Sequence, residues 1–361
     1  MLSIITAKYA DHNNDIILSD NAFNNFKLDL KNISKGNIVF IVDKIFLKKS
    51  FLKSFLYKNK NNTYLVSGGI SSKDIQSVKK IINFLNSKDL TKDGHIVAIG
   101  GGVVCDIVSF VASIYQRGIK LILIPTTTTS MMDSCIGGKT GINYNNVVNL
   151  IGTYYHPIRI YIDLRFISSL ADIDYKSGIA ESIKKAIILD KSLFTYLYDN
   201  YHKINQRKID EIFEMINKSI DIKLNITTND TFEKSSRLLL NYGHTFGQAI
   251  ESYFGINQKK MTHGYAVSLG MICASSMSDE IYNNNLYEIH LDILNKYNLP
   301  NKLKRIRNTE SFLKNLIINL NNDKKRTVEG YKFILAKEIG LGEIKFINNK
   351  KFIKESFRKI L

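Results

Sequence analysis

The first 165 residues alternate short apolar runs with stretches that have the periodicity of helices. Continuous apolar runs predict buried strands of a parallel sheet, at 37–43, 62–67, 95–100, 120–125 and 158–163. Helical periodicity lies between some of them, at about 71–86 and 104–115. Strands that alternate with helices favour an α/β domain, which we expect over residues 1–165.

The pattern changes from about residue 166 onward. Apolar residues there recur at every third or fourth position, which predicts long helices at 172–189, 192–201, 209–225, 263–282 and 286–297. Two short apolar runs, at 332–335 and 342–346, predict a late pair of strands. We therefore expect a second, mostly helical domain over residues 166–361.

The composition excludes several classes of protein. Of the 361 residues, 44% are hydrophobic, which is enough for a buried core and argues against a disordered chain. No run approaches the roughly 20 apolar residues of a membrane helix, and the N-terminus lacks the pattern of a secretory signal. The cysteines lack metal-site spacing and are expected as reduced, buried thiols: Cys105, Cys135 and Cys273. These features predict a cytoplasmic protein without a membrane partner.

The formal net charge of +17 changes this picture little. Such a charge attracts nucleic acids and anionic substrates. The lysines, however, are scattered over every predicted helix, and no single basic face with interleaved aromatic residues stands out. We interpret the charge as a solvated, lysine-rich surface and expect no nucleic-acid partner.

Glycines and polar residues gather at the carboxyl ends of the predicted strands, where open α/β sheets bind ligands. The segment Gly100–Asp106 leaves a strand and enters a helix, so its backbone could approach a pyrophosphate. Because Cys105 stands at the third glycine of G-x-G-x-x-G, a plain tight turn is the alternative. Asp43 could bind a ribose or be an ordinary loop carboxylate, and the threonines after Pro125 add hydroxyl groups at the same edge.

The segment Asp133–Asn149 combines three glycines with a lysine, a carboxylate and several amide side chains. Its glycines would let the backbone approach a ligand closely, and Lys139 would bring a positive charge to that point. A P-loop is excluded because Asp133 occupies the position of its first glycine. A ligand-binding loop and an ordinary glycine-rich loop both remain open from these residues alone.

Polar residues recur along one stretch of the second domain. Arg237, Asn241, His244 and Gln248 would form a single stripe of a helix, provided that Gly243 does not interrupt it.

Two histidines and a glutamate of the second domain could bind a metal ion. His263 lies at a predicted helix start, and Glu181 lies on the helix predicted at 172–189. Together with His244 they would leave an open position on Zn²⁺, the pattern of a catalytic zinc site. The alternative is a pair of ordinary hydrogen-bonded histidines, since no compact zinc signature such as H-E-x-x-H is present.

Taken together, these motifs resemble those of the 3-dehydroquinate synthases and the wider sugar phosphate cyclase superfamily. The resemblance extends from about residue 36 to 345, and the motifs that carry it occur in order: Gly100–Asp106, Arg117–Gly118, Pro125–Thr127, Asp133–Asn143, Asn149–Gly152, Gly178–Lys184, Leu240–Gly247, His263–Gly264 and Asp323–Lys325.

The resemblance implies an N-terminal Rossmann-like α/β domain that binds NAD and a mostly α-helical C-terminal domain that binds a divalent metal, with the active site in the cleft between them. It implies a homodimer in the cytoplasm and a zinc ion, with cobalt as an alternative. The implied reaction converts 3-deoxy-D-arabino-heptulosonate 7-phosphate to 3-dehydroquinate and phosphate, by oxidation, β-elimination, reduction and intramolecular aldol addition.

The resemblance also implies roles for individual residues. The metal ligands would be Glu181, His244 and His263. The catalytic residues would be Lys139, Lys184, Arg237, Asn241 and Gln248. The phosphorylated ketose would be bound by Arg117, which would reach the neighbouring subunit's phosphate site, and by Asp133, Lys139, Asn149, Lys223, Arg237 and Lys324 or Lys325. NAD would be bound by Asp43, Gly101, Gly102, Val103, Asp106, Thr126, Thr127, Asp133 and Lys139.

Four positions depart from the family's usual pattern. Val148 replaces a lysine, Gln248 replaces a histidine, and Tyr265 replaces a glutamate beside a metal ligand. Glutamine cannot act as an acid or base near neutral pH. The glutamate of a Gly-Glu-x-x-Lys motif is also missing from Gly69–Lys73. The alternatives are therefore a paralogous cyclase acting on another ketose phosphate and a degenerate relative without turnover; metal-dependent alcohol or glycerol dehydrogenases lack the Gly-Gly-Lys-Thr-Gly-Ile-Asn motif.

Overall fold

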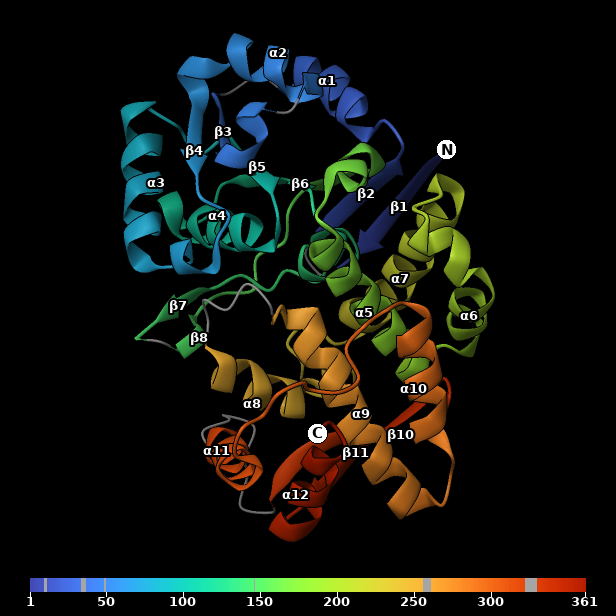
Figure 1. Cartoon of the computed structure of the whole chain (residues 1–361). Helices are drawn as coiled ribbons and strands as arrows, with labels where there is room; N and C mark the ends of the chain where they lie inside the picture. Colours follow the sequence, from blue (N-terminus) through green and yellow to red (C-terminus); the bar gives the residue numbers. More distant parts are fainter. Residues whose placement is uncertain (10–11, 34–36, 49, 146, 256–260, 322–329) are drawn as a thin grey trace. The chain divides into compact units, whose positions relative to one another are not determined.

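The computed structural model describes the chain apart from residues 10–11, 34–36, 49, 146, 256–260 and 322–329. The described residues form two compact units (Figure 1). Unit 1 comprises Met1–Leu170 and Lys223–Phe232, and unit 2 comprises Ala171–Ile222 and Glu233–Leu361. Among the described residues, no helix is long and apolar enough to cross a membrane.

A seven-stranded sheet forms the centre of unit 1, with the strand order β1-β2-β9-β6-β5-β3-β4. The strands are β1 (Leu2–Lys8), β2 (Asn13–Ser19), β3 (Ile38–Asp43), β4 (Thr63–Val66), β5 (His95–Gly100), β6 (Lys120–Pro125) and β9 (Arg159–Asp163). All neighbouring pairs are parallel except β1 and β2, which form an antiparallel hairpin. The five strands predicted from their apolar runs are confirmed. The β1–β2 hairpin was not predicted, because most residues of β1 are exposed or half-buried and the apolar run of β2 is limited to Ile16–Leu18.

Helices cover both faces of this sheet. They are α1 (Ala22–Ile33), α2 (Ser50–Lys58), α3 (Ile75–Ser87) and α4 (Gly102–Ile114). Helices α1 and α2 lie on one face, and α3 and α4 lie on the other (Figure 1). The chain changes direction across the sheet between β3 and β5, because β4 lies outside β3 and β5 returns to its inner side. Open α/β sheets bind ligands at such a switch point. A separate small hairpin consists of β7 (Ile142–Tyr144) and β8 (Val147–Ile151).

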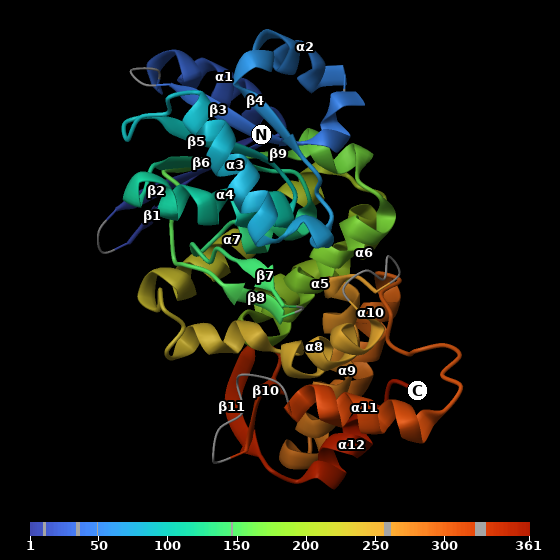
Figure 2. The same cartoon turned by 90° about the vertical axis from the view of Figure 1, so that its left-hand side faces the viewer.

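Unit 2 is mostly helical and is built around α9. Its elements are α5 (Asp172–Leu189), α6 (Lys191–Asn205), the part of α7 (Ile209–Asn229) up to Ile222, a short 3₁₀ helix (Ser236–Asn241), α8 (His244–Phe254), α9 (His263–Tyr282), α10 (Leu286–Lys296), α11 (Thr309–Asn321), β10 (Tyr331–Glu338), β11 (Leu341–Ile347) and α12 (Lys350–Arg358). Helix α9 packs against α5, α8, α10 and α12, and its residues are buried almost all round. Figure 2 shows α8, α9, α11 and α12 grouped together. The predicted α/β and helical fold classes are confirmed.

Two glycines of α9 allow unusually close packing of its neighbours. A methyl group at Gly270 would lie 2.0 Å from the carbonyl oxygen of Gly243, directly before α8. A methyl group at Gly264 would lie 2.1 Å from the carbonyl oxygen of Ser177 on α5. The small side chains of α9 therefore bring α5 and α8 close together around its N-terminal half.

The division of the chain differs in two respects from the expected boundary at residue 165. Unit 1 continues to Leu170, and it also includes Lys223–Phe232 from the second half of the chain. The physical reason is visible in two contacts: Lys223 bonds to Asp133, and the Thr227 hydroxyl lies 3.4 Å from the Tyr9 hydroxyl. The helical periodicity of α7 gave no sign of this change, because periodicity does not show which partner a helix packs against.

Candidate active site

The switch point of unit 1 brings Asp43 and the Gly100–Gly102 loop to the ends of neighbouring strands. Asp43 ends β3 and Gly100 ends β5, and the two strands are paired in parallel. A methyl group at Gly100 would lie 2.6 Å from Cβ of Val104, so glycine is needed for the first turn of α4 to pack on β5. Gly101 caps α4, whose backbone N–H groups can receive an anion. This arrangement fits the pyrophosphate of a dinucleotide.

Asp43 is held against the backbone of the next strand connection. Its Oδ1 accepts a hydrogen bond from the N–H of Ile45 at 3.1 Å, and a methyl group at Gly68 would collide with its Oδ2. Burial raises the pKa of Asp43, although the hydrogen bonds from the backbone N–H groups of Ile45 and Gly68 oppose the shift. The carboxylate is thus fixed in place at the edge where a ribose hydroxyl would lie.

Lys73, which was not predicted from the sequence, contacts two of the predicted site residues. Its Nζ donates to Asp106 Oδ2 and to Asn149 Oδ1, both at 2.5 Å, and the residue is only 6% exposed. Burial raises the pKa of Asp106, even though the Lys73 charge acts in the opposite direction. The signal in the sequence is the lysine at the end of Gly69–Lys73, which is retained although the glutamate of that motif is missing.

The loop that carries Lys139 is pinned by backbone hydrogen bonds. The N–H of Tyr155 donates to the Gly138 carbonyl at 2.8 Å, and the N–H of Thr140 donates to the Thr153 carbonyl at 3.0 Å. Gly138 has φ +68°, and a methyl group there would collide with the ring of His156. The Lys139 residue itself is exposed. A rigid loop with an exposed cation suits the binding of an anionic ligand.

Asp133 begins this loop and is paired with Lys223. The Lys223 Nζ donates to the Asp133 carbonyl at 2.6 Å and to its Oδ1 at 2.8 Å. The structure therefore brings these two predicted site residues together within unit 1.

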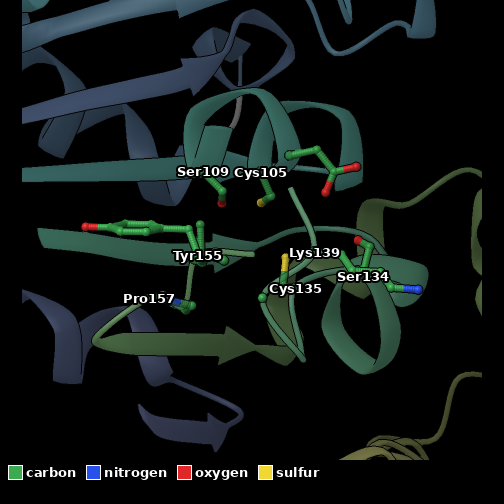
Figure 3. Close-up of a pocket in the computed structure, with 10 residues that line it drawn as sticks. Cys105, Ser109, Ser134, Cys135, Lys139, Tyr155 and Pro157 are labelled. Carbon is green, nitrogen blue, oxygen red and sulfur yellow. The ribbon is translucent and has the colours of Figure 1, made fainter. Parts of the chain in front are cut away.

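A cavity of about 10 Å³ lies beneath the same loop, between α4 and the segment that follows β8 (Figure 3). Figure 3 shows the thiols of Cys105 and Cys135 facing each other across it, with Tyr155 and Lys139 nearby. A volume of this size is at the lower limit for one water molecule, so it is a packing gap and not a substrate site. A hydrogen bond with Cys135, together with burial, raises the pKa of the Cys105 thiol well above its ordinary value. All three cysteines are free and buried, as predicted.

Unit 2 brings Glu181, His244 and His263 together from α5, α8 and α9. One ligand atom from each lies within 4.8 Å of the others. Glu181 Oε1 is 3.4 Å from His263 Nε2 and 4.0 Å from His244 Nε2. Ligands at ~2.1 Å from a tetrahedral Zn²⁺ lie about 3.4 Å apart, so the spacing fits the ion after only small movements.

The chemistry of the donor set also fits a metal. A carboxylate and two imidazoles are the usual ligands of catalytic zinc, and cobalt accepts the same set. The side chains are 0%, 12% and 40% exposed for Glu181, His244 and His263, so the cluster is closed on one side and open on the His263 side. An open coordination position is what a catalytic metal site requires.

Charged neighbours surround the cluster. Lys184 Nζ lies 2.5 Å from Glu181 Oε2, and both side chains are buried. Burial alone would lower the pKa of His263, but its hydrogen bonds with Glu181 and Glu251 outweigh burial and raise it to about 10. The metal-free cluster therefore attracts a cation, whether a proton or a metal ion.

The predicted polar stripe from Arg237 to Gln248 is not one continuous helix. A 3₁₀ helix ends at Asn241, and Gly243 with φ +72° starts α8 in a new direction. Arg237 is 1% exposed, and Asn241 donates to Glu233 Oε1 at 2.7 Å, whereas Gln248 is exposed on α8. The left-handed backbone at Gly243 is the reason for the break.

The remaining predicted residues take varied positions. Thr126 is buried, and its N–H donates to the Gly100 carbonyl at 3.0 Å, while the Thr127 hydroxyl lies 2.8 Å from that of Ser130. Arg117 is exposed, and Val103 lies in the first turn of α4. Lys324 and Lys325 lie outside the described residues.

Comparison with known proteins gives consistent results along the chain. Residues 63–177 match the family model for the 3-dehydroquinate synthase N-terminal domain, and residues 178–326 match the model for its C-terminal domain. The 3-dehydroquinate synthase of Sulfurisphaera tokodaii is 40% identical over 280 residues, 77% of each chain. That of Prochlorococcus marinus is 33% identical and covers 94% of this chain and 95% of its own.

Solved structures share the fold at lower identity. A 2-deoxy-scyllo-inosose synthase, solved with carbaglucose-6-phosphate, NAD⁺ and Co²⁺, has a TM-score of 0.85 at 23% identity and covers 99% of this chain and 100% of its own. A 2-epi-5-epi-valiolone synthase from Streptomyces hygroscopicus, solved with NAD⁺ and Zn²⁺, has a TM-score of 0.82 at 21% identity and covers 99% of each chain.

Proposed function

Because the chain belongs to the 3-dehydroquinate synthase family, we propose that it converts 3-deoxy-D-arabino-heptulosonate 7-phosphate to 3-dehydroquinate and phosphate, a step of the shikimate pathway to aromatic amino acids. The observation that carries this proposal is the cluster of Glu181, His244 and His263, which fits a catalytic divalent metal. The expected ion is Zn²⁺, with Co²⁺ as an alternative.

The metal would be held by these three side chains. A divalent ion in such a site lowers the pKa of a coordinated hydroxyl and so eases its oxidation. The residues around the ion then have separate tasks. Lys184 lies against Glu181 and holds the carboxylate in one orientation, and Lys184 also provides positive charge beside the place where a substrate oxyanion forms.

NAD would be held by unit 1. The N-terminus of α4 and the Gly100–Gly102 loop suit the pyrophosphate, and Asp43 suits a ribose. Thr126, Thr127 and Asp106 lie along the same sheet edge, and we assign Lys73 to this group through its bond to Asp106. NAD supplies the acceptor for a hydride and returns it later, so the overall reaction needs no external oxidant.

The substrate carries a carboxylate and a phosphate, so it needs cations. We assign substrate binding to Lys139, Lys223, Arg237 and Asn241 together with Asp133 and Asn149. The exposed Lys139 on its pinned loop is suited to an anionic group, and the buried Arg237 provides five donors in fixed geometry. A cation beside the phosphate stabilises the charge that develops as the C–O bond breaks and phosphate leaves.

Over the whole reaction, the bonds formed and broken and the protons transferred balance. Oxidation of one hydroxyl acidifies the neighbouring C–H, and loss of that proton expels phosphate by β-elimination. Reduction restores the hydroxyl, and ring opening with intramolecular aldol addition forms the carbocycle. Gln248 can donate a hydrogen bond to substrate but cannot carry a proton, so another group or the departing phosphate must do so.

A second candidate function is cyclisation of a different ketose phosphate. Val148, Gln248 and Tyr265 replace charged or titratable residues that the resemblance leads one to expect. The first candidate is favoured because identity to 3-dehydroquinate synthases reaches 40%, against 23% and 21% for the two cyclases with other products.

The state of assembly belongs to the same proposal. We propose a cytoplasmic homodimer in which the exposed Arg117 reaches the phosphate site of the neighbouring subunit. Size-exclusion chromatography with light scattering gives the assembly, and Arg117→Ala should raise KM for substrate more than it lowers kcat.

One assay tests the function. The chain is supplied with 3-deoxy-D-arabino-heptulosonate 7-phosphate, NAD and Zn²⁺, and both phosphate and the carbocyclic product are measured. Formation of 3-dehydroquinate with equal phosphate is the expected result. Turnover of another ketose phosphate alone would support the second candidate, and no phosphate from any ketose phosphate would refute both.

A further inference from the structure

Glu251 contacts a residue of the metal cluster from the side opposite the cluster. It lies on α8, seven residues after His244, and seven residues are about two turns of a helix. The same face of α8 therefore carries both residues. Glu251 Oε2 lies 3.2 Å from Nδ1 of His263, the first residue of α9.

The two nitrogens of the His263 ring face different carboxylates. Nδ1 meets Glu251, and Nε2 points to Glu181 Oε1 at 3.4 Å. His244 is arranged in the same way: its Nδ1 lies 3.1 Å from the Tyr242 carbonyl oxygen, and its Nε2 is the nitrogen nearer Glu181. Both imidazoles thus present Nε2 to the cluster and are held through Nδ1 from behind.

The contact at Nδ1 of His263 differs in kind from the contact at Nδ1 of His244. A main-chain carbonyl holds His244, whereas a side chain holds His263. His263 is also the more exposed of the two rings, at 40% against 12%, so packing restricts its rotation less. A carboxylate on the rear nitrogen fixes both the tautomer and the orientation of a metal-binding imidazole.

We propose that Glu251 is a positioning residue that holds His263 with Nδ1 protonated and Nε2 free to bind the metal. This inference rests on the proposed function only in requiring that the cluster binds a divalent ion. Glu251 is not itself part of the group of ligand atoms that converge within 4.8 Å. Its effect on the ion therefore passes through the imidazole.

The test measures metal binding apart from turnover. The full chain and its variants are stripped of metal, and Zn²⁺ affinity is measured by competition with a chromogenic chelator. Glu251→Ala should weaken Zn²⁺ binding about 10- to 100-fold, the range found when such outer partners are removed. Glu251→Gln keeps an acceptor oxygen and should lose much less. Glu280→Ala, an exposed carboxylate near the far end of α9, serves as the control and should bind Zn²⁺ like wild type.

A spectroscopic signature and a folding measurement separate positioning from simple damage. The visible spectrum of the Co²⁺-loaded protein should shift in Glu251→Ala, because the imidazole takes a different orientation, and the metal-free Tm should stay near that of wild type. Unchanged Zn²⁺ affinity in Glu251→Ala overturns the inference, as does equal loss in the Ala and Gln variants. Wild type that binds Zn²⁺ tightly but releases no phosphate overturns the proposed function and leaves the role of Glu251 standing.

Discussion

Gly270→Ala tests whether close packing of α9 sets the metal site. In an ordinary helix interior this change stabilises by about 1 kcal/mol, because alanine restricts the unfolded chain and favours the helix. Here the added methyl group would lie 2.0 Å from the Gly243 carbonyl oxygen and 2.8 Å from the Gly247 nitrogen. Both are backbone atoms that cannot rotate away.

The magnitude follows from these contacts. Ordinary contact begins at 3.4 Å, so α8 and α9 must separate by up to 1.4 Å (3.4 minus 2.0). Overpacking of this kind costs about 1–3 kcal/mol, which reverses the sign of the usual effect. For a unit of this size we expect Tm to fall by about 2–12 °C. His244 follows Gly243 directly, so the separation also moves a metal ligand, and Zn²⁺ affinity should fall at least about tenfold.

The measurements are thermal unfolding of the metal-free protein and chelator competition for Zn²⁺. The sign of the change in Tm distinguishes the two effects, because helix propensity predicts a higher Tm and the steric contact predicts a lower one. A Gly270→Ala variant with a raised Tm and unchanged Zn²⁺ affinity would refute the close approach of α9 to the start of α8.

Three further predictions address other parts of the chain. Lys139→Ala should lower kcat/KM for the ketose phosphate at least about tenfold while Zn²⁺ content and Tm stay unchanged, since Lys139 is exposed; an unaltered kcat/KM would remove it from the site. Lys73→Met leaves the Asp106 carboxylate half-buried without its cation, so we expect a loss of about 1–3 kcal/mol in urea unfolding and weaker NAD binding by fluorescence titration, and a variant as stable as wild type would contradict the importance of that pair. Burial lowers the pKa of His290 to about 4, below the ordinary value of 6.5. As the pH falls, the unfolded chain therefore takes up a proton at His290 before the folded chain does. The contribution of neutral His290 to the free energy of unfolding is fully present above pH 6.5 and is lost as the pH falls through 4. His290→Gln should therefore show a smaller loss of Tm than wild type over that pH range.

The parts of the fold that could be predicted are those in which one physical signal dominates. The run at 37–43 is apolar on both faces because β3 is covered on both sides, so it predicts a central strand. The β1–β2 hairpin escaped because exposed edge residues such as Ile4 carry no such signal. The sequence could suggest a helix break at Gly243. The direction that α8 takes after the break depends on the contact of Gly243 with Gly270, which is distant in the sequence.

The candidate site divides in the same way. Family motifs identified Glu181, His244 and His263, and the structure places their ligand atoms together, although their role as ligands stays a prediction. Lys73 stands at the lysine of a recognised motif, but its contacts with Asp106 and Asn149 join residues distant in the sequence. The contact of Glu251 with His263 leaves no local pattern either, so the tertiary structure was needed to find these contacts.

The two histidines of the cluster also differ in how mutation can reach them. The Tyr242 carbonyl that holds His244 belongs to the main chain, and any amino acid at that position would supply the same oxygen. The Tyr242 hydroxyl is anchored in turn by His290 at 2.8 Å, deep in the core. His263 depends on Glu251, which a single substitution can remove or shorten. Natural variation in metal preference within this fold should therefore enter at position 251 far more readily than behind His244.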